Sequence, residues 1–366
     1  MIKIVNIDEC LENYETYPME IIPQYDRISV KSSELTQTII ESDKKIAVVD
    51  CPYIQGPKLD LSHFDLVIVF SREWTGSHIN YEKQLQRHYS TDRLFFITGS
   101  AYSSDNHVMV PWMLFEITQP VNQEFRLVDW REPKSKIFDA LLGREKFHRR
   151  FVFDQLVNSQ LLDQSFVNIT LSEKESSARI KNTIYRSNNL NEFELAETKR
   201  YVEQHDHFCS FGFKQDGLTD SFVNRYANLI PWGIYENSSY TIVTETLYKS
   251  ETFLKNIFFP TEKTAKPLYA KRPFVIFSNR HFLKNLKQLG FETFSSVIDE
   301  SYDEVKHPLE RFNLAFNQVR ALASLNPADV YLRLGEILKH NHKHIINRAY
   351  FISPLRNKII ERINNL

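Results

Sequence analysis

Short apolar runs alternate with stretches of helical spacing along most of this chain, and this alternation restricts the possible fold most strongly. In the first third, the apolar runs are KKIAVVDCP, FDLVIVFS, RLFFITGS and HVMVPWMLFEI. They are rich in β-branched and aromatic residues and are closed by turn residues, which is typical of buried strands. Between them, SELTQTIIES and NYEKQLQRHYS have the spacing of amphipathic helices. Strands that alternate with helices form parallel sheets, so a doubly wound α/β domain is expected over residues 1–130.

A second alternating set follows the polar segment VDWREPKSK. Its expected strands are KIFDALLG, SFVNITLS, TIVTET and PFVIFS, and its expected helices are REKFHRRFVFDQLVNSQLL and FLKNLKQLG, the latter closed by Gly290. We assign this second Rossmann-like domain to residues 131–310, and helices that pack across both domains to residues 311–366. Two such domains facing each other would place their strand ends on a shared cleft, where open α/β sheets bind ligands.

The composition favours a soluble globular protein with room for two domains. The chain has 366 residues, of which 42% are hydrophobic and 25% charged, and its net charge is −1. Nine glycines leave no GxGxxG or GxxxxGK loop, and the three scattered cysteines fit a reducing compartment rather than a disulfide framework. No apolar run is long enough to span a membrane, and the N-terminus lacks a signal-peptide core, so a cytoplasmic protein without a stable membrane span is expected.

Acidic and basic residues lie together at the expected ends of a strand and a helix between residues 240 and 277. Glu245 ends a strand, Thr261 is placed to cap a helix, and Glu262 and Lys263 fall in its first turn. A carboxylate can accept vicinal sugar hydroxyls, whereas a lysine beside a helix N-terminus attracts phosphate. Lys266 lies one turn further on and either shares this face or is solvated. A ligand with hydroxyls and phosphates, such as a nucleotide sugar, would suit this set.

A basic cluster marks the expected start of the first helix of the second domain. It consists of Arg144, Lys146, His148, Arg149 and Arg150. Guanidinium groups at a strand end can bind a diphosphate in a fork and stabilise charge that develops on a leaving nucleotide. The alternative is a merely basic helix start, which the helix dipole disfavours. Arg149 is the first candidate for this role, followed by Arg144.

The same residues resemble the donor-binding region of the α-1,3-fucosyltransferase family, a GT-B type of glycosyltransferase. Glu245 matches the acidic position of its Phe-Glu-Asn-Ser stretch, although Thr246 stands where that family has Asn. Glu262 and Lys263 match its Thr-Glu-Lys signature, and Pro273 matches the proline of its Val-Pro-Val-Val strand. In that family these positions hold the ribose, sugar and phosphates of a GDP-sugar.

The chain is also similar to a group of proteins from phages and environmental bacteria that is suspected of glycosyl transfer. The shared patterns are Gly143-Arg144 with His148-Arg149, the TEKT-x-KP segment at 261–267, GFETF at 290–294 and DESYD at 299–303. This similarity covers most of the second domain.

The resemblance implies a metal-independent, inverting transfer from a nucleotide sugar, with a GDP-sugar favoured, to an acceptor hydroxyl. No cofactor would be required, and the acceptor would be a saccharide or another glycoconjugate. Arg149 would act in catalysis by stabilising the leaving group, and a general base is expected from the first domain. Glu73 is the first candidate for the base and Asp50 the second, with Asp105 and His107 in a later loop.

Two alternative functions remain open from the sequence. Phage-like relatives suggest a DNA-base glycosyltransferase acting on hydroxymethylated pyrimidines, with Trp74, Tyr102 and Trp112 as candidates to hold a flipped base. A non-catalytic protein-binding scaffold with a degenerate fold is the other. Metal sites are not expected, because the DESYD carboxylates lack the alternation of a calcium loop and the histidines of HNHKH lack further ligands.

Overall fold

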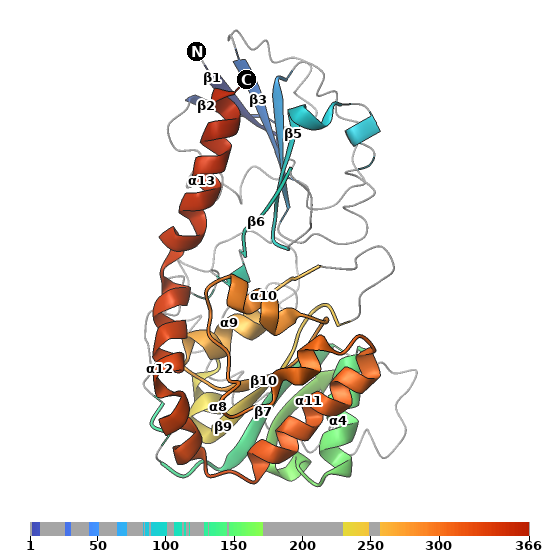
Figure 1. Ribbon diagram of the computed structural model, residues 1–366, viewed down its shortest axis with the longest axis vertical. Coiled ribbons are helices and arrows are strands. Elements are labelled where there is room, and N and C mark those ends of the chain that lie inside the picture. The colour runs from blue at the N-terminus through green and yellow to red at the C-terminus, as the bar shows by residue number, and fades with distance from the viewer. Residues whose placement is uncertain are drawn as a thin grey trace, which may run out of the picture. The chain divides into compact units, whose positions relative to one another are not determined.

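The computed structural model of the chain describes residues 2–7, 26–30, 44–50, 64–71, 83, 85–87, 89–100, 106–111, 113–114, 117, 128–130, 132–144, 146–170, 230–248 and 257–365. Internal contacts divide the chain into two units, and each contains its own parallel sheet (Figure 1). The first unit comprises Met1–Trp112, Glu251–Phe259 and Asn347–Leu366, and the second comprises Met113–Ser250 and Pro260–Ile346. The α/β class is therefore confirmed, whereas the domain bounds suggested by the sequence stay predictions.

The first unit contains a six-stranded parallel sheet with the order β2-β1-β3-β4-β5-β6. Its strands are β1 (Ile2–Ile7), β2 (Asp26–Val30), β3 (Lys44–Asp50), β4 (Leu66–Ser71), β5 (Leu94–Thr98) and β6 (His107–Met109). From β1 the chain adds β2 on one side and β3 to β6 on the other. The strand order therefore reverses between β1 and β3, and Asp50 is the last residue of β3.

The second unit contains a four-stranded parallel sheet with the order β10-β9-β7-β8. Its strands are β7 (Lys136–Arg144), β8 (Ser165–Thr170), β9 (Ser238–Thr244) and β10 (Phe274–Phe277). Helix α4 (Phe147–Asn158) follows β7, and helix α9 (Glu262–Tyr269) lies between β9 and β10. The chain adds β8 on one side of β7 and β9 on the other, so this sheet reverses its order between β7 and β9.

Helices cover both faces of the second sheet. On one face α11 (Pro308–Ala323) contacts α4 and β10 (Figure 1), and the rings of Phe151, Phe277 and Phe312 lie within 6.4 Å of one another. On the other face α12 (Pro327–Ile346) contacts α9, and Tyr331 stacks on Tyr240 of β9 at 6.5 Å. Buried aromatic contacts on both sides explain why the strands read as continuous apolar runs.

A buried ion pair crosses the second sheet. Arg272 Nη2 donates to Asp139 Oδ2 at 2.8 Å, and both side chains are fully buried. The same guanidinium donates to the carbonyls of Tyr235 and Ser238, and it lies 4.3 Å from the Tyr235 ring centroid. Burial of charge is tolerated only with such hydrogen bonding, because removing one partner leaves an uncompensated ion. No sequence pattern pointed to this pair.

The polar residues near the end of α12 bind the ends of other helices. His340 and His344 donate through Nε2 to the carbonyls of Gly290 and Leu289 at 2.8 and 2.7 Å, beyond the end of α10 (Phe282–Gln288). Asn341 exchanges hydrogen bonds with both main-chain groups of Glu292. Side chains of the HNHKH segment thus bind carbonyls that lie beyond the end of α10 and lack intrahelical partners.

The strands expected from apolar periodicity are present, and so are the helices expected over residues 144–162 and 282–290. The helix expected over SELTQTIIES lies outside the described residues, and the one expected over NYEKQLQRHYS is described only in part. The strand expected over HVMVPWMLFEI is shorter, because β6 ends at Met109. The helical region expected over residues 311–366 includes two separate helices, α12 and α13 (Arg348–Asn364), which belong to different units. Strands β1 and β2 were not anticipated. Gly290 has φ +92°, which confirms its position after the end of α10.

Candidate functional site

The candidate site lies where β7 and β9 end side by side at the carboxyl edge of the second sheet. Ligands of open α/β sheets bind at such a reversal of strand order, because two neighbouring connections leave the sheet in opposite directions there. The connection after β7 leads into α4, and the connection after β9 contains Glu245 and Thr246. His148 Nε2 donates to the Glu245 carbonyl at 2.7 Å, which joins the two connections although they are 97 residues apart.

The start of α4 places three basic or titratable side chains at this edge. Lys146 is the N-cap residue, and its Nζ donates to the Thr246 carbonyl at 3.0 Å. Arg149 is only 5% exposed. Gly143 has φ +65°, and a Cβ built on it would lie 3.6 Å from Arg149 Nη1. The guanidinium therefore lies against the end of β7, where a glycine adopts the left-handed conformation without strain.

His148 is neutral at physiological pH. Burial is the main cause, and it lowers the pKa of His148 to about 3. The hydrogen bond to the Glu245 carbonyl opposes this effect, whereas the charges of Arg149, Lys146 and Lys263 add to it. Because all three cations lower the pKa of His148, all three lie close to its imidazole ring.

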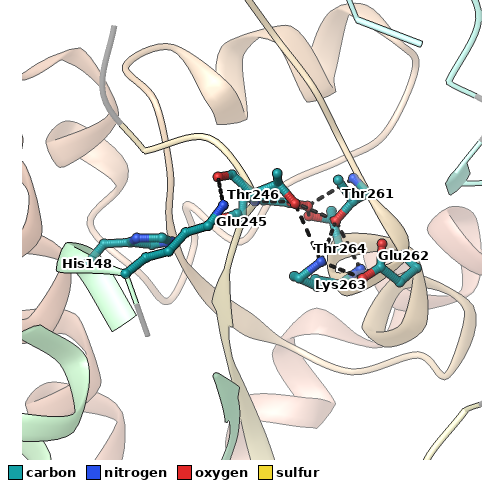
Figure 2. A network of polar contacts seen from close by, with 8 residues as sticks. His148, Glu245, Thr246, Thr261, Glu262, Lys263 and Thr264 are labelled. Carbon is teal, nitrogen blue, oxygen red and sulfur yellow. Dashed lines mark hydrogen bonds and ion pairs between the residues drawn. The ribbon is translucent and has the colours of Figure 1, made fainter. Parts of the chain in front are cut away.

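Glu245 fastens the start of α9 to the end of β9 (Figure 2). One carboxylate oxygen accepts from the main-chain N–H of Thr261 at 3.0 Å and from the Thr264 hydroxyl. The other accepts from the Thr261 hydroxyl at 2.7 Å and from the N–H of Thr246 at 3.0 Å. Thr261 is also the N-cap of α9, as expected, because its side chain accepts from the N–H of Lys263.

This arrangement gives Glu245 a supporting role at the candidate site. The sequence suggested that Glu245 itself binds sugar hydroxyls and that the α9 N-terminus attracts phosphate. In the structure Glu245 is fully buried, and protein groups use the acceptor positions of its carboxylate. Its negative charge occupies the helix N-terminus where an external anion would otherwise bind.

Lys263 and Glu262 form the more exposed part of the cluster. Lys263 Nζ donates to Glu262 Oε1, and it lies 3.5 Å from the hydroxyls of both Thr246 and Thr261. The Lys263 side chain is 25% exposed and that of Glu262 is 10% exposed. Burial by itself raises the pKa of Glu262, but the charge and hydrogen bond of Lys263, together with Lys266, hold that pKa below its ordinary value.

Arg149 belongs to the same cluster. Burial lowers the pKa of Arg149, and the charges of Glu245 and Glu262 oppose that shift. Two lysines from different segments of the chain bind Thr246. Lys146, before α4, donates to the carbonyl of Thr246, and Lys263, in α9, donates to its hydroxyl. With Lys266, the cations of this cluster outnumber its carboxylates by two, so the cluster can accept a doubly charged anion.

The sequence-predicted residues are therefore partly brought together. His148, Arg149, Glu245, Thr261, Glu262 and Lys263 share one polar cluster, and buried Lys266 acts on it through its charge. Arg144 is the last residue of β7. Sequence reasoning did not select Lys146 or Thr246 as binding residues. Lys146 was visible in the basic cluster, but its approach to Thr246 depends on the order of the strands.

The candidates for the general base lie in the first unit. Asp50 ends β3 beside the reversal of strand order, and its side chain is not among the described groups. Outside the described residues lie the base candidates Glu73 and Asp105. So do the candidates to hold a flipped base, Trp74, Tyr102 and Trp112. His107 is in β6 and stacks on Phe96 at 4.7 Å.

The acidic DESYD segment stabilises neighbouring turns. Asp303 accepts the N–H groups of Leu283 and Lys284 at the start of α10, at 3.1 and 3.0 Å. Glu300 accepts from the Thr293 hydroxyl and the N–H of Phe294. Within the part of the chain that the structure describes, no group of three or more histidine, cysteine or acidic residues could hold a metal ion.

Comparison with family models, curated proteins and solved structures found no match to this chain. Among the helices of the described residues, none is both long and apolar enough to cross a membrane.

Proposed function

We propose that this protein is a glycosyltransferase that uses a nucleotide sugar, with a GDP-sugar favoured, and transfers the sugar to an acceptor hydroxyl. The observation that carries the proposal is that Lys146 and Lys263 both bind Thr246. Arg149 lies near enough for the charge of Glu262 to oppose the lowering of its pKa by burial. This cluster lies at the strand reversal of a parallel sheet, which is the general ligand position of such folds.

The chemistry of the cluster suits a sugar diphosphate. Phosphate oxygens accept from ammonium and guanidinium groups, and Arg149 offers a planar fork for two of them. As the bond to the sugar breaks, negative charge grows on the departing nucleoside diphosphate, and fixed cations stabilise that charge. Glu262 stays ionised, and its side chain, at 10% exposure, is less deeply buried than that of Glu245, so it is the carboxylate of the cluster that can accept hydrogen bonds from sugar hydroxyls.

In this proposal each sheet is one Rossmann-like domain of a GT-B arrangement, and the first presents the acceptor. Asp50 then serves as the general base, because its backbone position at the strand reversal of the first sheet corresponds to that of the donor site. Asp50→Asn should abolish sugar transfer while leaving donor binding unchanged. Full transfer activity in this variant would exclude Asp50 as the base.

A thermal-shift panel with UDP-, GDP- and CMP-sugars tests donor binding. We expect one nucleotide class to raise the melting temperature of the wild type, and Lys263→Ala to weaken its binding about ten- to hundred-fold, since a hydrogen bond to a charged group contributes about 1.5–3 kcal/mol. Lys339→Ala is the matched control, because Lys339 also pairs with a nearby glutamate, Glu336, on an exposed face of the same unit. Absence of a shift with every nucleotide would favour a non-catalytic scaffold.

A further inference from the structure

Three aromatic rings are arranged face to face next to the basic cluster. His148 and Tyr248 are stacked with 4.4 Å between ring centroids and an interplanar angle of 16°. Phe147 continues the arrangement beyond Tyr248, with 6.1 Å between centroids and an angle of 28°. Phe312, which is fully buried, contacts all three rings from α11 at 6.2–6.5 Å. We call Phe147, Tyr248 and His148 the aromatic stack.

Hydrogen bonds hold the inner part of the aromatic stack in place. His148 is fixed by its bond to the Glu245 carbonyl, and Arg311 Nη2 donates to the carbonyl of Tyr248 at 3.0 Å. Ser278 donates to the carbonyl of Leu247, immediately before Tyr248. The side chains of Ser278, just after β10, and of Arg311, in α11, therefore hold the main chain that carries the Tyr248 ring.

Phe147 is the outer member of the stack and is 51% exposed. It directly follows Lys146 and directly precedes the neutral His148, so an uncharged aromatic surface adjoins the cations assigned to the diphosphate. A single exposed apolar residue is ordinary on a protein surface. Here, however, the exposed ring belongs to an ordered stack at the carboxyl edge of β7, where the proposed donor binds.

We propose that the nucleobase of the donor stacks on the exposed ring of Phe147, the outer member of the aromatic stack, an inference that rests on the function proposed above. Every nucleobase has a flat π-face, and stacking on an aromatic side chain contributes about 1–3 kcal/mol per base. The cluster around Thr246 holds the diphosphate, and the aromatic stack holds the other end of the nucleotide. A purine covers more of the stack than a pyrimidine does, so the stack favours GDP over UDP.

Titration calorimetry with pyrophosphate, GDP and UDP separates the aromatic stack from the cation cluster. For the full chain carrying Phe147→Leu, we expect GDP to bind about ten-fold more weakly than to the wild type, which corresponds to about 1.4 kcal/mol. Pyrophosphate affinity should stay unchanged, and the preference for GDP over UDP should shrink. Phe147→Trp keeps an aromatic face and should restore GDP affinity. Leu332→Ala, which removes a side chain that is 79% exposed elsewhere in the second unit, is the control and should leave all affinities unchanged.

Two results would overturn the proposed nucleobase site on Phe147 but would leave the diphosphate site at the cation cluster standing. One is wild-type GDP affinity in Phe147→Leu. The other is an equal loss of pyrophosphate and GDP binding, which would mean that Phe147 acts through the fold. A different result, in which the wild type binds neither pyrophosphate nor any nucleoside diphosphate, would overturn the proposed function and this inference together.

Discussion

His148 makes the stability of the second unit depend on pH. An unfolded histidine takes up a proton as the pH falls below 6.5, whereas burial keeps folded His148 neutral down to a pKa of about 3. The folded state therefore binds fewer protons, and its stability falls by about 1.4 kcal/mol per pH unit as the pH drops from about 6.5 towards 3.

The variant His148→Gln tests this dependence, because glutamine can still donate to the Glu245 carbonyl but cannot titrate. We expect the loss of unfolding free energy between pH 7 and pH 5 to be about 2 kcal/mol larger in the wild type than in the variant. Denaturant unfolding at the two pH values measures it. Equal losses in both proteins would show that His148 does not stay neutral in the folded state.

Glu245 and Glu262 are both buried acids beside α9, yet they should differ strongly in their effect on stability. Glu245→Gln replaces one acceptor oxygen with a donor that faces protein donors, and we expect a loss of about 3 kcal/mol. Glu262→Gln affects a contact with a partly exposed lysine and should cost less than about 1 kcal/mol. Chemical denaturation of both variants measures the difference, and similar losses would contradict a supporting role for Glu245.

At the scale of elements, α10 depends on a carboxylate from a distant turn. Asp303 accepts two of the N–H groups at the start of this helix, those of Leu283 and Lys284, and it is 5% exposed. Asp303→Ala should lower the free energy of unfolding by about 2 kcal/mol, because it removes the acceptor for both groups. The exposed Glu336→Ala should change it by less than about 0.5 kcal/mol. A neutral Asp303→Ala would mean that water replaces the carboxylate.

The elements themselves were largely predictable, since apolar periodicity and capping residues are local signals. KIFDALLG, TIVTET and PFVIFS are strands, and Thr261 caps α9 as its side chain and position suggested. The end of α12 was not predictable in this way. His340 and Asn341 bind main-chain groups beyond the end of α10, and such long-range partners leave no periodic pattern.

The candidate site required knowledge of the strand order. The acidic and basic motifs after β7 and β9 were each visible in the sequence, but only the adjacency of these two strands brings Lys146 to Thr246. The same applies to Glu245. Its position at a strand end was expected, whereas its use by Thr246, Thr261 and Thr264 follows from the packing of α9 against β9.

At the scale of the whole molecule, the second unit has its own covered parallel sheet and its own core. A fragment of residues 113–346, which also carries the segment Glu251–Phe259 of the first unit, should therefore fold alone and melt cooperatively. It should also keep the nucleotide-dependent thermal shift, because the cation cluster and the aromatic stack lie within it. Circular dichroism and thermal shift measure both properties. A fragment that folds but no longer responds to nucleotide would assign part of the donor site to the first unit.

A crystal structure of the full chain with the nucleoside diphosphate that stabilises it most would test the central claim directly. The account predicts phosphate oxygens within about 3 Å of Arg149 and of the ammonium groups of Lys146 and Lys263. A nucleotide bound elsewhere, with none of these three side chains in contact with its phosphates, would contradict it.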